Sequence, residues 1–270
     1  MLRRRLTPPG WREATTAPKS PKVHSGTTPD RFPKREITRA RYSFRSVIST
    51  IPTAYLPIAR RKYGRTDSRV LAEDSQLVIE GFQRSGNTFA YYAFELAQPT
   101  PVKVAHHLHA AGQVVAGARR HLPVLLLVRE PHDAIVSHLV REPTVTVKQA
   151  ISHWVRFHRA VLPYRDRFTV GEFTEVTTDF GSVTRRLNER FRTSFGEFEH
   201  TKENVARCFE LIEARNRTLF DGRIDERFVA RPSSDRDALK DRFEEDYRSA
   251  AARPLRRRAE ALYADLVGTA

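Results

Sequence analysis

Apolar residues in the second part of the chain gather in short blocks, each followed by a turn and a longer mixed segment. Such blocks cover 77–82, 101–105, 123–128 and 168–173, and short apolar runs bounded by turn signals predict buried strands. The block at 123–128 (PVLLLV) is apolar on both faces, which is typical of a central parallel strand.

The segments between these blocks have the composition and periodicity of helices. Residues 87–98 contain no glycine and end before Pro99, and Pro131 is well placed as the first residue of a helix. We expect further helices over 110–120, 146–161, 180–191, 205–212 and 235–267, the last interrupted by Pro254. Alternating strands and helices predict an α/β fold in three layers, with a parallel β-sheet flanked by helices.

Charge divides the chain into parts. The net charge is +15, but residues 1–66 hold 16 basic and 3 acidic residues, whereas 67–270 hold 31 and 29. We therefore expect a disordered, basic N-terminal arm at 1–33, a basic helical lead-in at 34–66 and one folded domain at 67–270.

The lead-in combines cations with returning apolar residues in a pattern of one or two amphipathic helices, broken near Pro52. Packing against the domain is the favoured interpretation, and contact with an anionic membrane or a polyanion is the alternative. No nucleic-acid motif accompanies the charge, so nucleic acid is not an expected partner. The chain has no long apolar run, and its single cysteine, Cys208, excludes an internal disulfide; we expect a cytoplasmic protein.

The strongest chemical signal is the loop after the first predicted strand. Residues 81–88 (GFQRSGNT) follow the spacing G-x-x-x-x-G-x-T, between a strand and a helix. Glycines let several N–H groups face one anion, and the helix N-terminus adds partial positive charge. The lysine that a nucleotide-binding loop carries after its second glycine is Asn87 here, and the nearby cation is Arg84.

A second signal lies 45 residues after Arg84: the strand 124–128 ends at Arg129, and residues 129–137 (REPHDAIVS) place Ser137 on the next helix. Together, residues 83–89 (QRSGNTF) and this motif resemble the sulfotransferases that use 3′-phosphoadenosine 5′-phosphosulfate (PAPS), whose fold is related to that of P-loop NTPases. The resemblance covers 77–137. Gln83 departs from the family's proline, and Arg84 replaces its usual lysine, as in many bacterial members.

The resemblance implies an enzyme that transfers a sulfuryl group from PAPS to an acceptor hydroxyl. By this resemblance, Arg129 and Ser137 would hold the 3′-phosphate of the donor. Arg84 would stabilise charge on the leaving phosphate, and the loop residues would bind the 5′-phosphosulfate: Ser85, Gly86, Asn87 and Thr88. No divalent metal is expected. The acceptor expected from the resemblance is a glycan, a lipid head group, a peptide tyrosine or a small metabolite, with a carbohydrate or glycolipid favoured.

Transfer to a hydroxyl requires a general base, which many family members supply from a histidine after the second strand. Residues 103–109 (KVAHHLH) occupy that stretch, and His106 and His107 are both candidates. Glu80 and Glu95 are alternative bases. The late basic loop of the family is absent as such; residues 231–236 (RPSSDR) are a weaker candidate for late phosphate contacts, and a charged helix start explains them equally well.

Two other functions are consistent with the same residues. A P-loop phosphotransferase or NTPase without its usual lysine would need ATP and Mg²⁺, but no carboxylate motif for Mg²⁺ is evident. A non-catalytic, sulfotransferase-like module could instead bind a polyanion through the basic arm, with steep salt dependence.

Overall fold

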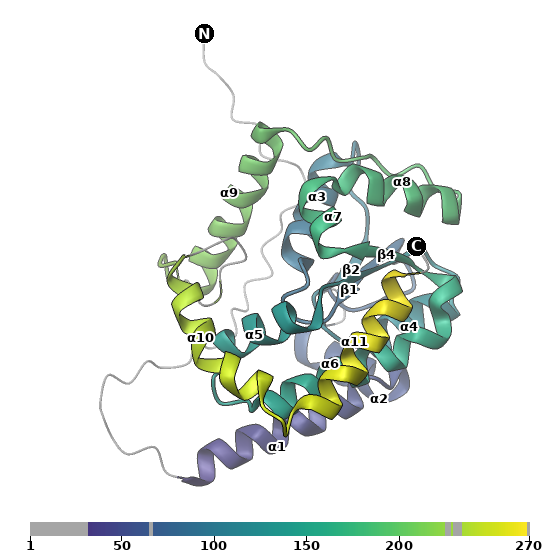
Figure 1. Ribbon diagram of the computed structural model, residues 1–270. Coiled ribbons are helices and arrows are strands. Elements are labelled where there is room, and N and C mark those ends of the chain that lie inside the picture. The colour runs from purple at the N-terminus through teal and green to yellow at the C-terminus, as the bar shows by residue number, and fades with distance from the viewer. Residues whose placement is uncertain (1–31, 65–66, 225–227, 229–233, 269–270) are drawn as a thin grey trace.

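A four-stranded parallel sheet forms the centre of the protein, in a computed structural model that describes residues 32–64, 67–224, 228 and 234–268 (Figure 1). In sheet order β2-β1-β3-β4, the strands are Val104–His106, Leu77–Gly81, Val124–Val128 and Thr169–Glu172. Ile79 of β1 pairs with His106 on one side and with Leu125 on the other. The predicted parallel α/β architecture is confirmed.

Helices follow the strands in the predicted alternation. The helices after β1, β2 and β3 are α3 (Asn87–Ala97), α4 (Ala111–Arg119), α5 (Pro131–Arg141) and α6 (Val147–Val161). A short 3₁₀ helix, η1 (Leu162–Arg167), leads into β4. The remaining helices are α7 (Phe173–Thr178), α8 (Phe180–Phe191), α9 (Lys202–Leu219), α10 (Ser234–Arg248) and α11 (Arg253–Val267).

Alternate residues of the strands pack against two different layers of helices. Leu77, Ile79, Leu125 and Leu127 join a core with α3, α8 and α9. The intervening strand residues, among them Val78, Ala105 and Leu126, face the other way and pack with α4, α5, α6 and α11. This alternation is the two-residue period of a strand, and Figure 1 shows the resulting three layers with the sheet in the middle.

Two further helices precede the sheet: α1 (Phe32–Ile48) and α2 (Pro52–Tyr63). Arg39 Nε donates to the carbonyl oxygen of Thr144 at 2.9 Å, and Gln149 Nε2 donates back to the carbonyl oxygen of Arg39 at 3.1 Å. Buried Tyr55 and Leu56 hold α2 in a small separate core. The lead-in is therefore attached to the domain; residues 1–31, most of the expected arm, lie outside the described residues.

The strand order creates a switch point between β1 and β3. The chain leaves β1 toward β2 on one side, then returns to build β3 and β4 on the other side. Loops after β1 and β3 therefore diverge at adjacent strand ends, where open parallel sheets bind ligands. The last residue of β1 is Gly81. A larger residue does not fit there, because its Cβ would lie 2.4 Å from the carbonyl oxygen of Leu127.

Histidines are unusually prominent in the interior. Burial lowers the pKa of His106, His109, His138 and His158 to about 3. It also lowers the pKa of His107 and His153 well below 6.5. These rings are therefore uncharged in the folded protein at neutral pH.

We expect acid to unfold the protein at a comparatively high pH. Each of the six histidines takes up a proton near pH 6.5 when unfolded but not when folded. The free energy of unfolding should therefore fall, by about 1.4 kcal/mol per histidine and pH unit, as the pH drops below about 6.5. Glu80, whose pKa burial raises to about 8, acts in the opposite direction and offsets about one of the six histidines down to its ordinary value of 4.5. Circular dichroism during an acid titration should give an unfolding midpoint near pH 5. A chain that stays folded at pH 4 would contradict this expectation.

Candidate active site

The loop between β1 and α3 turns through two left-handed residues, Arg84 (φ 68°) and Gly86 (φ 86°). A positive φ is strained for arginine, and strain of this kind gathers at functional sites. The N–H of Ser85 donates to the carbonyl oxygen of Phe82 at 3.3 Å, which closes the turn. Gly86 is the N-cap of α3, so the first-turn amides of that helix, which make no intrahelical hydrogen bond, lie at the loop.

Asn87 occupies the position at which a nucleotide-binding loop carries lysine. Its side chain is buried, and its Nδ2 donates to the carbonyl oxygen of Phe82 at 3.0 Å. The amide thus fastens the turn and supplies no charge, which leaves Arg84 as the cation of the loop.

The two sequence motifs meet at the switch point. Arg84 Nε donates to the hydroxyl of Ser137 on α5 at 2.9 Å. Arg129, directly after β3, donates through Nη1 to the carbonyl oxygen of Arg84 at 3.2 Å. The Arg129 guanidinium also lies 4.0 Å from the ring centre of Phe173 and pairs with Asp133. Residues that the sequence places 45 and 53 positions apart therefore form one connected unit.

This unit lines a cavity of about 980 Å³. Its wall includes Arg84, Gly86, Asn87, Thr88, Arg129 and Ser137 from the two motifs. Eight basic side chains and one acidic side chain, Glu142, line it among the described residues. Such a cation excess in a partly enclosed space favours an anionic ligand.

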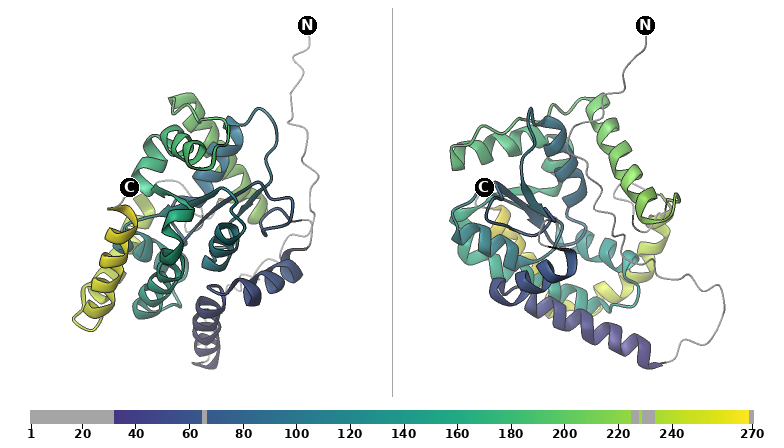
Figure 2. Two further views of the ribbon diagram at one scale, coloured as in Figure 1. Left: turned by 90° about the vertical axis from the view of Figure 1, so that its right-hand side faces the viewer. Right: turned by 180° about the vertical axis from the view of Figure 1, so that it is seen from behind.

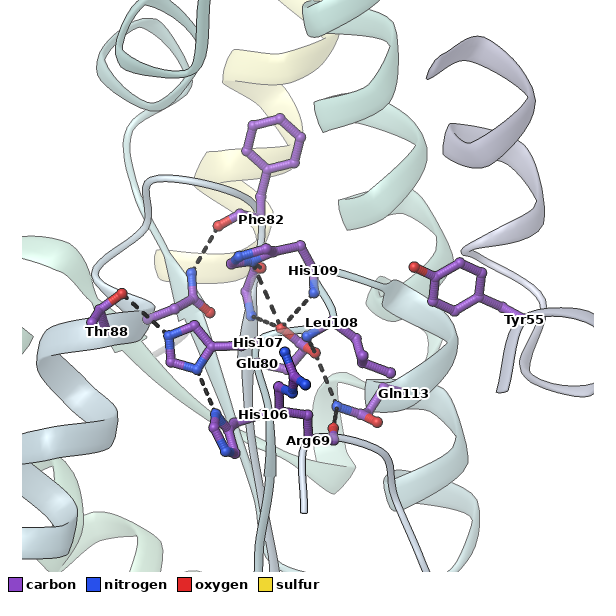
Figure 3. A network of polar contacts seen from close by, with 12 residues as sticks. Tyr55, Arg69, Glu80, Phe82, Thr88, His106, His107, Leu108, His109 and Gln113 are labelled. Carbon is purple, nitrogen blue, oxygen red and sulfur yellow. Dashed lines mark hydrogen bonds and ion pairs between the residues drawn. The ribbon is translucent and has the colours of Figure 1, made fainter. Parts of the chain in front are cut away.

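His107 enters the cavity from the loop after β2 (Figure 3). Its Nε2 lies 3.2 Å from Thr88 Oγ1 and 3.2 Å from Arg215 Nη1. A guanidinium can only donate, so Nε2 is the acceptor, and the ring proton resides on Nδ1, which contacts His106 Nδ1. The imidazole therefore presents an unprotonated nitrogen beside the loop between β1 and α3.

The other candidate, His106, has a different environment. Its ring is buried and stacks on Tyr91 with 3.9 Å between ring centres, and it does not line the cavity. Of the two predicted histidines, the structure places only His107 in the cavity wall, with His106 behind it. His109 also reaches the cavity, but its Nδ1 hydrogen-bonds to the carbonyl oxygen of Gly81 at 3.0 Å.

Glu80 holds this histidine loop in place. Its carboxyl group is fully buried on β1 and accepts hydrogen bonds from the N–H groups of Leu108 and His109, each at 3.0 Å. It also accepts from Gln113 Nε2 at 3.0 Å and from its neighbour Gly81 at 3.3 Å (Figure 3). Burial raises the pKa of Glu80 to about 8, against the opposing effect of these N–H donors.

This network explains how the loop adopts a strained backbone. His107 and His109 both have left-handed conformations, with φ of 58° and 49°. Glu80 offsets that strain with hydrogen bonds on both sides of Leu108. It does not line the cavity, and neither does Glu95, so the structure gives both alternative bases no access to a ligand there.

Several cavity residues were not predicted from the sequence, and two of them are arginines next to predicted residues. Arg141 lies one helical turn after Ser137 on α5, with its guanidinium 4.9 Å from the ring centre of Phe228. Arg215 comes from α9 and contacts His107. Arg141 lies four residues after Ser137, and this helical spacing could have predicted that both side chains face the same site. No such spacing relates Arg215 to the motifs.

Other predicted residues lie outside the cavity wall. The Ser85 side chain is buried and makes no hydrogen bond among the described residues. Residues 231–233 of the weaker late motif lie outside the described residues, and no side chain of 234–236 is described. In the described part of the chain, one group could hold a metal ion: Glu130, His132 and Asp133, at the start of α5. His132 also contacts Glu244, and Glu130 accepts from the N–H of Asp133.

Comparisons with known proteins give little beyond the fold. No protein-family model matches the chain, and no curated protein matches it by sequence. Among solved structures, the chain is similar to that of a mouse sulfotransferase complexed with PAP, at a TM-score of 0.36 and 14% identity, covering 70% of this chain and 90% of that chain. A likeness at this level carries no argument about activity, which therefore depends on the residues of the site.

We expect Glu80→Ala to destabilise the protein strongly, because it leaves four buried N–H groups without an acceptor and opens a cavity. The free energy of unfolding should fall by about 3 kcal/mol or more in chemical denaturation. Glu95→Ala, on the partly buried side of α3, is the matched control and should change it by less than about 1 kcal/mol. Equal effects of the two substitutions would show that the Glu80 network is not structurally important.

Proposed function

We propose that the protein is a PAPS-dependent sulfotransferase, which moves a sulfuryl group to an acceptor hydroxyl. The observation that carries the proposal is the connected unit of Arg84, Ser137 and Arg129, with His107 beside it. It brings two phosphate-binding motifs and an unprotonated imidazole into one cation-rich cavity.

The 5′ end of the donor would bind at the loop between β1 and α3. The amides at the start of α3 and the Thr88 hydroxyl offer hydrogen-bond donors, and Arg84 offers a guanidinium. Arg129 and Ser137 lie on the α5 side of the same cavity and would bind the 3′-phosphate. The planar fork of Arg129 suits a phosphate, and its Nε has no hydrogen-bond partner among the described residues.

The reaction then requires positioning and charge stabilisation. The acceptor oxygen attacks sulfur, and the bond between sulfur and the 5′-phosphate oxygen breaks. The electron pair of that bond remains on adenosine 3′,5′-bisphosphate (PAP), where Arg84 and the loop amides stabilise the added charge.

His107 would accept the proton of the acceptor hydroxyl at Nε2. The ring is neutral at physiological pH, so its lone pair is free of a proton. Thr88 and Arg215 direct their donors at that same nitrogen, and an acceptor hydroxyl would take their place during the reaction.

Asn87 counts against the phosphotransferase alternative. An ATP-dependent enzyme of this loop type uses a lysine at that position to reach the outer phosphates. Here the side chain is buried and bonded to Phe82, so it cannot do so. The Glu130 group, with its carboxylates and histidine, does not line the cavity and offers no metal to a nucleotide bound there.

Binding of PAP tests the donor site. We expect calorimetry to give a Kd in the micromolar range, with ATP, ADP and 5′-AMP at least about tenfold weaker because they lack the 3′-phosphate. Arg129→Ala should weaken PAP binding by about tenfold to hundredfold. Arg207→Ala, on the exposed surface of α9, is the matched control, and thermal melting shows that each variant is folded.

Three outcomes would redirect the assignment. Binding of ATP with Mg²⁺ but not PAP would favour the phosphotransferase. PAP binding that is unchanged in Arg129→Ala would place the 3′-phosphate elsewhere. Binding of neither nucleotide, with salt-sensitive binding of heparin, would favour the non-catalytic polyanion module.

Substitution of His107 tests the general base. Labelled sulfuryl transfer from PAPS to a panel of carbohydrates and glycolipids should fall about 10²- to 10⁴-fold in His107→Asn, while PAP affinity changes by less than about twofold. Asparagine tolerates the left-handed backbone at this position. His121→Asn is the matched control, because His121 is exposed and has a similar φ of 55°. Full transfer by His107→Asn would exclude His107 as the base.

A further inference from the structure

Large apolar side chains are exposed mainly on the first two helices. Five of the seven such residues in the described part of the chain lie between 37 and 58: Ile37, Phe44, Val47, Ile51 and Ile58. Phe44 is 66% exposed and Ile37 57% exposed. Phe44 and Val47 lie seven and ten residues after Ile37, so the three side chains share one face of α1. We call these five residues the apolar stripe.

The stripe is accompanied by positive charge. Residues 32–64 contain eight basic residues and one acidic residue, Glu36. Lys34 and Arg41 on α1, and Arg61 and Lys62 on α2, are exposed. By their helical spacing, Lys34 and Arg41 lie beside Ile37 and Phe44 on α1. Apolar side chains bordered by cations fit the interface of an anionic lipid bilayer. The apolar side chains insert into the interface, and the cations pair with the anionic lipids.

The same two helices also contribute to the candidate active site. Tyr42 and Arg45 of α1, and Tyr63 of α2, line the cavity, and so does Lys62, one helical turn after Ile58. Figures 1 and 2 show α1 along the outer edge of the molecule, where it packs on α6, and none of the other described helices covers its outer side. One pair of helices thus carries the apolar stripe and part of the cavity wall.

Other occupants of the stripe are less consistent with these observations. A second copy of this chain would bring two basic stripes together, which like charges oppose. Residues 1–31, with seven basic and two acidic residues, would meet the same repulsion. A polyanion such as heparin would satisfy the cations but would leave Phe44 and Ile37 in water. None of the described helices is long and apolar enough to cross a bilayer, so membrane contact would be at the surface.

We propose that α1 and α2 dock the protein on an anionic membrane surface through the apolar stripe and its flanking cations. Docking would hold the cavity wall next to the lipid headgroups. This inference does not depend on sulfuryl transfer, because it rests on the exposed apolar stripe and its cations.

Co-sedimentation of the full chain with vesicles tests the proposal. Vesicles of phosphatidylcholine with about one third phosphatidylglycerol should bind the protein, and pure phosphatidylcholine vesicles should bind it at least about tenfold more weakly. The double substitution Ile37→Ser/Phe44→Ser should weaken binding by about tenfold or more at constant salt. Leu96→Ser, at an exposed apolar residue of α3, is the matched control and should change binding by less than about twofold.

A charge variant gives a second, independent readout. Lys34→Glu/Arg41→Glu should weaken binding to the anionic vesicles and reduce its dependence on salt. Both positions are exposed, so folding should be preserved, as a thermal melt would show.

Four results would overturn the proposal. The first is the absence of vesicle binding by the full chain. The second is binding that survives the serine substitutions but not high salt, which would assign it to basic residues alone. The third is preferential binding of heparin over vesicles. The fourth is a dimer in sedimentation velocity that the serine substitutions dissociate, which would assign the stripe to a second copy.

Discussion

The buried carboxyl group of Glu80 is the constraint on which the geometry of the candidate site depends. A polar group without hydrogen-bond partners is costly to bury. Here four N–H groups surround the carboxyl oxygens, and two of these donors belong to the loop that carries His107. The same interaction therefore satisfies the carboxyl group and fixes a loop whose backbone is strained at two histidines.

Gln113 extends this constraint beyond the site. Its Oε1 accepts from the N–H of Leu71 at 2.9 Å, and its Nε2 donates to the carbonyl oxygen of Arg69 as well as to Glu80. The side chains of Gln113 and Glu80 thereby connect three parts of the molecule: the segment that precedes β1, the helix α4 and the histidine loop. A site at the carboxyl ends of the strands is thus supported from within the molecule.

Sequence patterns predicted the fold closely where local signals were strong. Pro123 and Pro131 bracket β3, and Gly86 and Pro99 bracket α3, so both elements were placed to within two residues. The meeting of Arg84 with Arg129 and Ser137 also follows, because parallel strands bring their carboxyl ends to one edge.

The sequence could not separate His106 from His107. Their side chains diverge because β2 ends at His106 and the chain then enters a left-handed residue, a conformation that no nearby glycine announces. Arg215 was missed for a different reason: it reaches the site from α9, 108 residues after His107, and only tertiary packing brings them together. Glu80 was a candidate base in the sequence, and its role became clear only from its four donors.

The hydrogen bond between Arg84 and Ser137 has a consequence for how ligand binding is divided between the two motifs. Groups joined directly in this way do not contribute independent increments of free energy. A ligand that engages only one motif must disturb a contact on which the other relies, whereas a ligand long enough to reach both can replace that contact at each end. The affinities of fragments would then fail to sum to that of the whole, and recognition would depend on the span between two anionic groups as well as on their presence.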